Sequence, residues 1–340
     1  MKKVLFATTA LIATAGMAAA EVKVSGYARF GLDWNEANDG TLPTNTGTAG
    51  DVLDSADETN ITSRFRLQFD VSTETDGGVT LGGRIRAQAE NRDGSQGAAS
   101  WSSPQFHVAY GGLRVNVGNI WGAIDSAPGL YLNTTSVGTG IDGMGFNSLA
   151  IQGAGFDTFT SAGVGRGGVE AIYSAGGFTG HISYSKQNDT YVSDGSGAGT
   201  VDATTLTEGE ERTAIMLSYS FGDYFVTGAY QDSSVAANDE VGFLAAGADF
   251  GQFGATLSYG TTEATDAITL VGEAEIGSAS TLIGWVSGRD ANTTGGNDDT
   301  AFGINYEYDL GGGATFVAGY VNNGADTNEN SVQAGVHFSF

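Results

Sequence analysis

The chain contains no cysteine and only three prolines. Without cysteine, no disulfide framework is available, so the fold has to be held by packing and hydrogen bonds. The three prolines occur beside 54 glycines, 13 tyrosines and 18 phenylalanines. Disordered and linker sequences usually contain more proline and fewer aromatic residues, so this composition indicates an extensive packed surface.

Positive charge is also scarce. The sequence has 14 lysine and arginine residues against 39 aspartate and glutamate residues, which gives a formal net charge of −25. Nucleic-acid binding requires a basic surface, so this balance excludes nucleic acid as a general partner.

A long hydrophobic run is found nowhere except at the N-terminus. There Lys2 and Lys3 precede the apolar segment VLFATTALIATAGM, and Ala18–Ala20 supply an A-x-A cleavage site. This pattern predicts a signal peptide over residues 1–20 and a mature chain over residues 21–340. The apolar run is too short for a spanning anchor, and no later run reaches the length of a transmembrane helix, about 18 residues. Export with this signal predicts that the mature protein lies in a bacterial envelope or is secreted.

Alternation of apolar and polar residues recurs along the mature chain. In three segments, apolar residues occupy every second position and polar residues occupy the positions between them. The segments are residues 22–34 (VKVSGYARFGLDW), 80–90 (TLGGRIRAQAE) and 332–340 (VQAGVHFSF). Such a period of two is typical of a β-strand with one apolar and one polar face.

Short glycine-rich turns join these strands in pairs, and longer polar connections separate the pairs. The turns include YGG at residues 110–112, FGD at 221–223 and DLGGG at 309–313. Seven hairpins plus one strand at each terminus predict an all-β fold, a 16-stranded antiparallel transmembrane β-barrel. A soluble β-sandwich would also alternate, but it would rarely hold sixteen strands in one sheet.

Two arginines in the segment SRFRLQFDV, residues 63–71, determine which face is polar. Arg64 and Arg66 alternate with Phe65, Leu67 and Phe69. An arginine on the lipid face at mid-membrane would destabilise the protein by roughly 2–4 kcal/mol. The two arginines are therefore expected to face the lumen, and the apolar side chains between them to face lipid. When the polar positions of every alternating strand are assigned to the lumen in this way, six of the ten arginines are predicted to form a basic pore wall. They are Arg29, Arg64, Arg66, Arg84, Arg86 and Arg114. In an alternative interpretation, they only pair with lumen acids such as Asp33, Asp70 and Glu90.

The connection from residue 119 to residue 167 lacks alternation. Its length and its apolar content predict a functional loop that folds into the barrel and constricts it. Its acids are Asp125, Asp142 and Asp157, which are expected to face the basic wall.

These features resemble the general diffusion porins of alphaproteobacteria over the whole mature chain. The resemblance is carried by EVKVSGYARFGLDW, LRVNVGNIWGAID, YSAGGFTGHISYS and the terminal VQAGVHFSF. It implies an outer-membrane homotrimer in contact with lipid and lipopolysaccharide, a third loop folded inward, and passive diffusion of ions and small polar solutes. It also implies calcium among the acids of the third loop, but this loop has only three, which puts that site in doubt.

Other functions remain as alternatives. Arg64, Arg66, Arg84 and Arg86 would suit a substrate-specific porin for anionic ligands. An enzyme inside the barrel is disfavoured, because His107, His181 and His337 lie in no recognisable serine–histidine–aspartate pattern. A secreted calcium-binding repeat protein would need a nonapeptide period, which is absent.

Overall fold

The structure is a computed structural model. It describes residues 20–38, 57–92, 95–96, 99–144, 146, 148–149, 154–191, 206–235, 239–294, 298–327 and 329–340. The predicted signal peptide, residues 1–20, lies outside these ranges except for its last residue. None of the described residues forms a helix long and apolar enough to cross a membrane.

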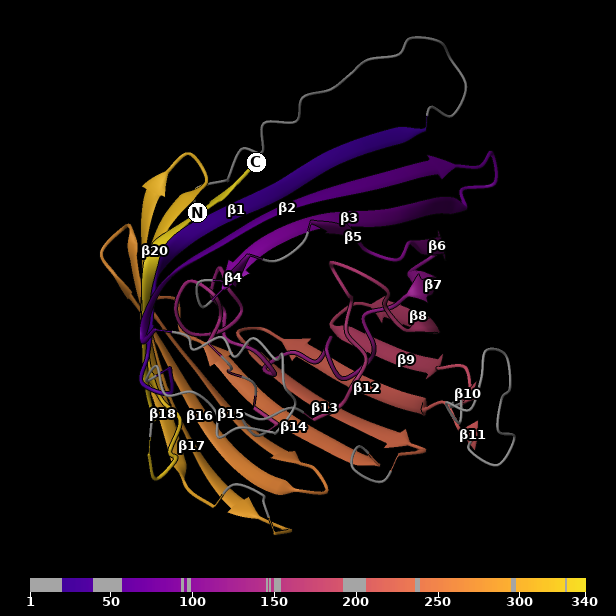
Figure 1. Ribbon diagram of the computed structural model, residues 1–340. Coiled ribbons are helices and arrows are strands. Elements are labelled where there is room, and N and C mark those ends of the chain that lie inside the picture. The colour runs from indigo at the N-terminus through magenta and orange to yellow at the C-terminus, as the bar shows by residue number, and fades with distance from the viewer. Residues whose placement is uncertain are drawn as a thin grey trace, which may run out of the picture.

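Sixteen long antiparallel strands form a closed barrel in the described part of the chain, as the alternation predicted (Figure 1). The first strand pairs with the last, from Tyr27 opposite Ser339 to Asn35 opposite Ser331, which closes the sheet. Closure leaves no strand edge whose backbone groups would meet hydrocarbon unpaired. The barrel strands are β1 (Glu21–Asn35), β2 (Thr59–Glu74), β3 (Thr80–Arg92), β6 (Gln105–Tyr110), β7 (Leu113–Asn119), β8 (Gly167–Ala175), β9 (Phe178–Lys186), β12 (Glu211–Phe221), β13 (Tyr224–Ser233), β14 (Glu240–Asp249), β15 (Phe253–Thr261), β16 (Thr265–Ile276), β17 (Ser280–Ala291), β18 (Thr300–Gly311), β19 (Ala314–Asn322) and β20 (Asn330–Ser339).

Four very short strands belong to the longer connections. β4 (Ser95–Gln96) and β5 (Ser100–Trp101) pair with β3, and β10 (Thr190–Tyr191) pairs with β11 (Leu206–Thr207). The opposite end of the barrel carries the seven tight turns. Short turns are typical of the periplasmic end of an outer-membrane barrel and long loops of its extracellular end.

The turn between β6 and β7 shows why glycine recurs at the periplasmic end. Gly111 and Gly112 connect Tyr110 to its cross-strand partner Leu113, and their φ angles are 58° and 86°. Two consecutive residues with positive φ suit a tight hairpin, because that backbone twist matches the twist of the flanking strands. Residues with a side chain rarely adopt this conformation, so the glycines permit the turn.

The two faces of β12 illustrate the predicted partition of side chains. Ile215, Leu217 and Tyr219 point outward and are between 44% and 50% exposed, whereas Ala214 and Met216 point inward and are buried. The same alternation runs around the barrel, so its exterior is an apolar belt suited to lipid.

The buried core lies inside the barrel, between the wall and the connection from β7 to β8. Figure 1 shows this segment, in magenta, within the ring of strands. One hydrophobic cluster joins loop residues to β12 and β14, and a second joins Leu132 and Phe146 to β17, β18 and β19. The loop members of the first cluster are Ala123, Ile124, Ala127, Leu130 and Leu149. The loop therefore folds inward because its apolar side chains find apolar partners on the lumen face.

Candidate functional site

Five of the six predicted wall arginines lie together on the lumen face of three neighbouring strands. Arg29 on β1 is opposite Arg64 on β2, which in turn is opposite Glu90 on β3. Arg66 on β2, and Arg84 and Arg86 on β3, lie on the same face of the sheet. We call Arg29, Arg64, Arg66, Arg84 and Arg86 the basic wall.

Acceptors on the facing strand orient the basic wall. The Arg64 Nε atom donates to Glu90 at 2.7 Å, and the Arg84 Nε atom donates to Asp70 at 2.6 Å. These two pairs agree with the alternative interpretation, in which the arginines pair with lumen acids. Asp33, the third acid considered, instead accepts a hydrogen bond from Gln333 at 2.9 Å.

Arg114 lies apart from the basic wall. It is one residue beyond the tight turn that ends at Leu113, and its Nε donates to Asn116 at 2.7 Å. β6 stands between β3 and β7, so Arg114 lies two strands away from the nearest arginines of the basic wall. The sequence placed it on the lumen face, and its position just after a turn indicated the periplasmic rim.

Only one of the three loop acids meets the basic wall. The Asp142 carboxylate lies 2.6 Å from the Arg29 guanidinium and also accepts a hydrogen bond from the Thr62 hydroxyl. Its backbone N–H donates to Gln333 at 2.9 Å. The middle of the loop is thus attached to β1, β2 and β20.

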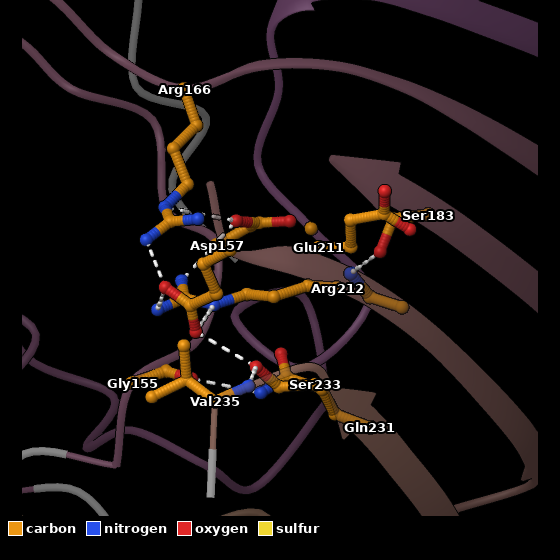
Figure 2. Close-up of polar contacts among 12 residues, drawn as sticks. Gly155, Asp157, Arg166, Ser183, Glu211, Arg212, Gln231, Ser233 and Val235 are labelled. Carbon is orange, nitrogen blue, oxygen red and sulfur yellow. Dashed lines mark hydrogen bonds and ion pairs between the residues drawn. The ribbon is translucent and has the colours of Figure 1, made fainter. Parts of the chain in front are cut away.

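Asp157 contradicts the expectation that it faces the wall, because its partners lie across the barrel. It is 3.3 Å from Arg212 on β12 and 4.0 Å from Arg166 at the end of the loop (Figure 2). Arg212 also makes two hydrogen bonds to Glu210, at 2.8 and 3.1 Å, and Arg166 pairs with Glu210 as well. We call Asp157, Arg166, Glu210 and Arg212 the loop latch.

Asp125 likewise lies away from the basic wall. It accepts a hydrogen bond from the Tyr131 hydroxyl at 2.7 Å. Burial raises the pKa of Asp125 to about 6, because desolvation disfavours the carboxylate more than the tyrosine stabilises it. The nearby negative charge of Glu170 acts in the same direction.

The dispersal of these acids does not fit a calcium site. Calcium requires six to eight oxygen ligands around one point. Asp125 contacts Tyr131 within the loop, whereas Asp142 and Asp157 contact arginines on different strands of the barrel. Among the described residues, no group of three or more acidic, histidine or cysteine side chains converges.

A further cluster, which parity did not reveal, holds the start of the loop. The buried Glu170 on β8 accepts hydrogen bonds from Gly122 N–H at 2.9 Å and Asn116 at 2.7 Å. His181 Nε2 lies 3.0 Å from the same carboxylate. Of these residues the sequence marked only His181, as lumen-facing. Asn116 and Gly122 lie 54 and 48 residues away from Glu170 in the chain. Asp157 lies 55 residues away from Arg212, so these contacts follow only from the fold.

The loop also reaches the basic wall at Arg86. The guanidinium carbon lies 5.0 Å from the Trp121 ring centre and 4.6 Å from that of Phe159, and Nη1 donates to Ser161 at 3.0 Å. The loop therefore contacts the basic wall at Arg29 and at Arg86. Among the described residues, Arg64, Arg66 and Arg84 make their hydrogen bonds and ion pairs with β1, β2 and β3 instead.

Known proteins resemble this chain over almost its whole length. The family model described as Gram-negative porin matches residues 7–329. Porins of Fuscovulum blasticum and Rhodobacter capsulatus are 29% and 26% identical over 325 and 347 residues, each match covering 94% of this chain and 100% of the relative. Two solved structures of mutant Rh. blastica porin superimpose with TM-scores of 0.71 and 0.70 at 26% and 25% identity, covering 94% of this chain and 100% of theirs. With the barrel, the inward loop and the charged lumen, these matches show that the chain belongs to the Gram-negative porin family, whose members form non-enzymatic diffusion channels in the outer membrane.

Proposed function

We propose that the basic wall and the segment from residue 119 to 167 together form the waist of a general diffusion channel. The observation that carries this proposal is the position of the loop. Its backbone N–H groups donate to lumen-facing side chains from one side of the barrel to the other, Ala123 to Ser183 on β9 and Asp142 to Gln333 on β20. This arrangement leaves the β2–β3 part of the basic wall facing the remaining passage.

The waist would act as a physical sieve. Small hydrophilic solutes and ions pass through water between the wall and the loop, and no bond is made or broken. The guanidinium groups of the basic wall set up a positive field on one side of the waist, which orders water and disfavours apolar solutes. The loop carboxylates are held elsewhere, by Arg29, Tyr131 and Arg212.

Ion preference follows from two opposing sets of charges. The basic wall favours anions at the waist, whereas acids at the extracellular ends of the strands, such as Glu58 and Asp299, favour cations at the mouth. With a formal net charge of −25, we expect a weak preference for cations.

Planar-bilayer recording tests this proposal. Reversal potentials in a salt gradient are measured for the wild type and for a variant with Arg64→Gln and Arg66→Gln. Neutralising these residues should shift the reversal potential further toward cations. An unchanged reversal potential would remove both arginines from the waist, and the absence of any conductance would contradict a channel.

The resemblance to general diffusion porins also supports a homotrimer that contacts outer-membrane lipid and lipopolysaccharide. Native mass spectrometry in detergent, with and without added lipopolysaccharide, tests both statements. A mass of three chains and a further increment with lipopolysaccharide are expected. A monomer under every condition would contradict the trimer.

A further inference from the structure

The basic wall contains a sequence repeat that pairs with itself. Residues 64–70 read Arg-Phe-Arg-Leu-Gln-Phe-Asp, and residues 84–90 read Arg-Ile-Arg-Ala-Gln-Ala-Glu. Both follow the pattern Arg-x-Arg-x-Gln-x-acid on the lumen face. Because β2 and β3 are antiparallel, the register places each arginine opposite an acceptor. The four facing pairs are Arg64 with Glu90, Arg66 with Gln88, Gln68 with Arg86, and Asp70 with Arg84.

The hydrogen bonds reproduce this two-fold symmetry. In the outer pairs, Arg64 and Arg84 donate from Nε to a carboxylate, at 2.7 and 2.6 Å. In the inner pairs, Arg66 donates from Nε to Gln88 at 2.6 Å, and Arg86 donates to Gln68 at 2.8 Å. Each glutamine then donates to the acid two residues further along its strand, Gln88 to Glu90 at 3.1 Å and Gln68 to Asp70 at 2.7 Å.

Charge is distributed unevenly over this network. The outer arginines each face a carboxylate, which compensates their charge locally. The inner arginines, Arg66 and Arg86, face neutral amides. The two uncompensated positive charges of the network are therefore adjacent, at its centre of symmetry. As diagonal neighbours across two strands, these side chains are close enough to contact one small ligand.

Aromatic rings fix the orientation of both inner guanidinium groups. Arg66 lies over the Tyr27 ring at 4.9 Å, and Arg86 lies against Trp121 and Phe159 at 5.0 and 4.6 Å. Because Nε of each is occupied by a glutamine, the Nη groups are the donors left for a ligand. Arg86 uses Nη1 for Ser161. Within the described residues, no hydrogen-bond acceptor is found for either Nη group of Arg66.

We propose that Arg66 and Arg86 form a binding site for a small oxyanion, one that carries at least two oxygen atoms on a phosphate-like or carboxylate group. Guanidinium groups bind such anions through pairs of charge-assisted hydrogen bonds, and prior orientation by the glutamines lowers the entropy lost on binding. The site rests on the proposed function only in that the anion reaches it through the water-filled lumen. It would retain oxyanions during passage, in preference to halides.

Calorimetric titration of the detergent-solubilised protein with inorganic phosphate at constant ionic strength tests the site, with chloride as the control anion. Arg66→Gln and Arg86→Gln should each weaken phosphate binding by about tenfold or more, since each removes a charged hydrogen-bonding partner. The matched control combines Arg84→Gln with Asp70→Asn. It removes an outer pair without changing the net charge, and should leave phosphate affinity within about threefold of wild type.

Arg66→Lys separates a specific site from general electrostatics. Lysine keeps the positive charge but lacks the planar fork and the Nε donor, so phosphate affinity should fall while the reversal potential in potassium chloride stays near that of the wild type. Heat-modifiable migration on a detergent gel shows that each variant is a folded barrel. If either glutamine variant fails to fold, the other glutamine variant and Arg66→Lys provide the measurement.

The outcomes separate this site from the channel proposal. A conducting protein that shows no phosphate binding, or whose inner and outer variants lose affinity equally, overturns the oxyanion site and leaves the channel intact. A protein that binds phosphate but never conducts overturns the channel proposal and leaves the site. Partial block of the wild-type current by phosphate, relieved by Arg66→Gln and not by the matched control, supports both.

Discussion

Asp142 of the loop and Arg29 of β1 form a salt bridge of 2.6 Å inside the barrel, and the two side chains are only 9% and 2% exposed. This contact joins the middle of the loop to the strand at which the barrel closes. A carboxylate and a guanidinium so deeply buried depend on each other, because neither can regain its hydration when the other is removed.

Asp142→Asn should therefore destabilise the protein strongly. It removes the Asp142 carboxylate from the buried Arg29 guanidinium, and breaking a buried ion pair in this way typically costs about 3–5 kcal/mol. The free energy of unfolding in urea, followed by tryptophan fluorescence in detergent, measures this loss. The double variant Arg29→Met with Asp142→Leu removes both charges and should be more stable than Asp142→Asn alone. A double variant as unstable as the sum of the two single changes would show that the pair is not coupled.

Breaking the loop latch should loosen the end of the loop without unfolding the barrel. Arg212→Met removes the more deeply buried of the two arginines that contact both Asp157 and Glu210. Residues near Asp157 should then be cleaved faster by protease, and single-channel current noise should rise. The control is Lys186→Met. It breaks the neighbouring pair of Lys186 with Glu211, which is half-exposed, and should leave both readouts unchanged. Equal protease sensitivity of the two variants would argue against the latch.

Asp125 should make stability depend on pH. Its pKa in the folded protein is raised from 3.8 to about 6, so the fold favours the protonated carboxyl. The wild type therefore loses stability as the pH rises through about 6. Asp125→Asn keeps an acceptor for Tyr131 but carries no charge. Its thermal midpoint should exceed that of the wild type at pH 8 and match it at pH 4. A difference that does not depend on pH would exclude ionisation of Asp125 as the cause.

Opposite faces of one strand should tolerate arginine differently. Leu257 on β15 is 55% exposed on the lipid side, and its neighbour Thr256 points into the lumen. Leu257→Arg should cost about 2–4 kcal/mol at mid-membrane, whereas Thr256→Arg should be tolerated, because water hydrates its charge. Folding yields into lipid vesicles at a series of urea concentrations measure the difference. Similar yields for both variants would contradict the assigned faces.

The alternation in the sequence was enough to predict the barrel. A period of two is a local property, and lipid outside with water inside leaves one acceptable orientation for Arg64 and Phe65. Glycines such as Gly111 marked the tight turns for an equally local reason, since few other residues adopt positive φ. The loop was recognised from its loss of alternation, and it lies between the end of β7 at Asn119 and the start of β8 at Gly167.

The partners inside the lumen were not predictable in the same way. All three loop acids were expected at the basic wall, yet Asp142 alone reached it, while Asp157 lies at Arg212 and Asp125 at Tyr131. The alternation places a side chain on one face of a strand, but it does not give the neighbours of that side chain across the barrel.

The sequence by itself determined that this chain forms a barrel, which face of each strand is wet, and which segment leaves the wall. These properties depend on residues close together in the chain, and on the fact that apolar side chains are stable in lipid whereas charged side chains require water. Only the tertiary structure decided which charges meet, because a connection of this length has many possible courses through the lumen. The course it takes is selected by apolar packing of residues such as Leu130 and Phe146 against the wall.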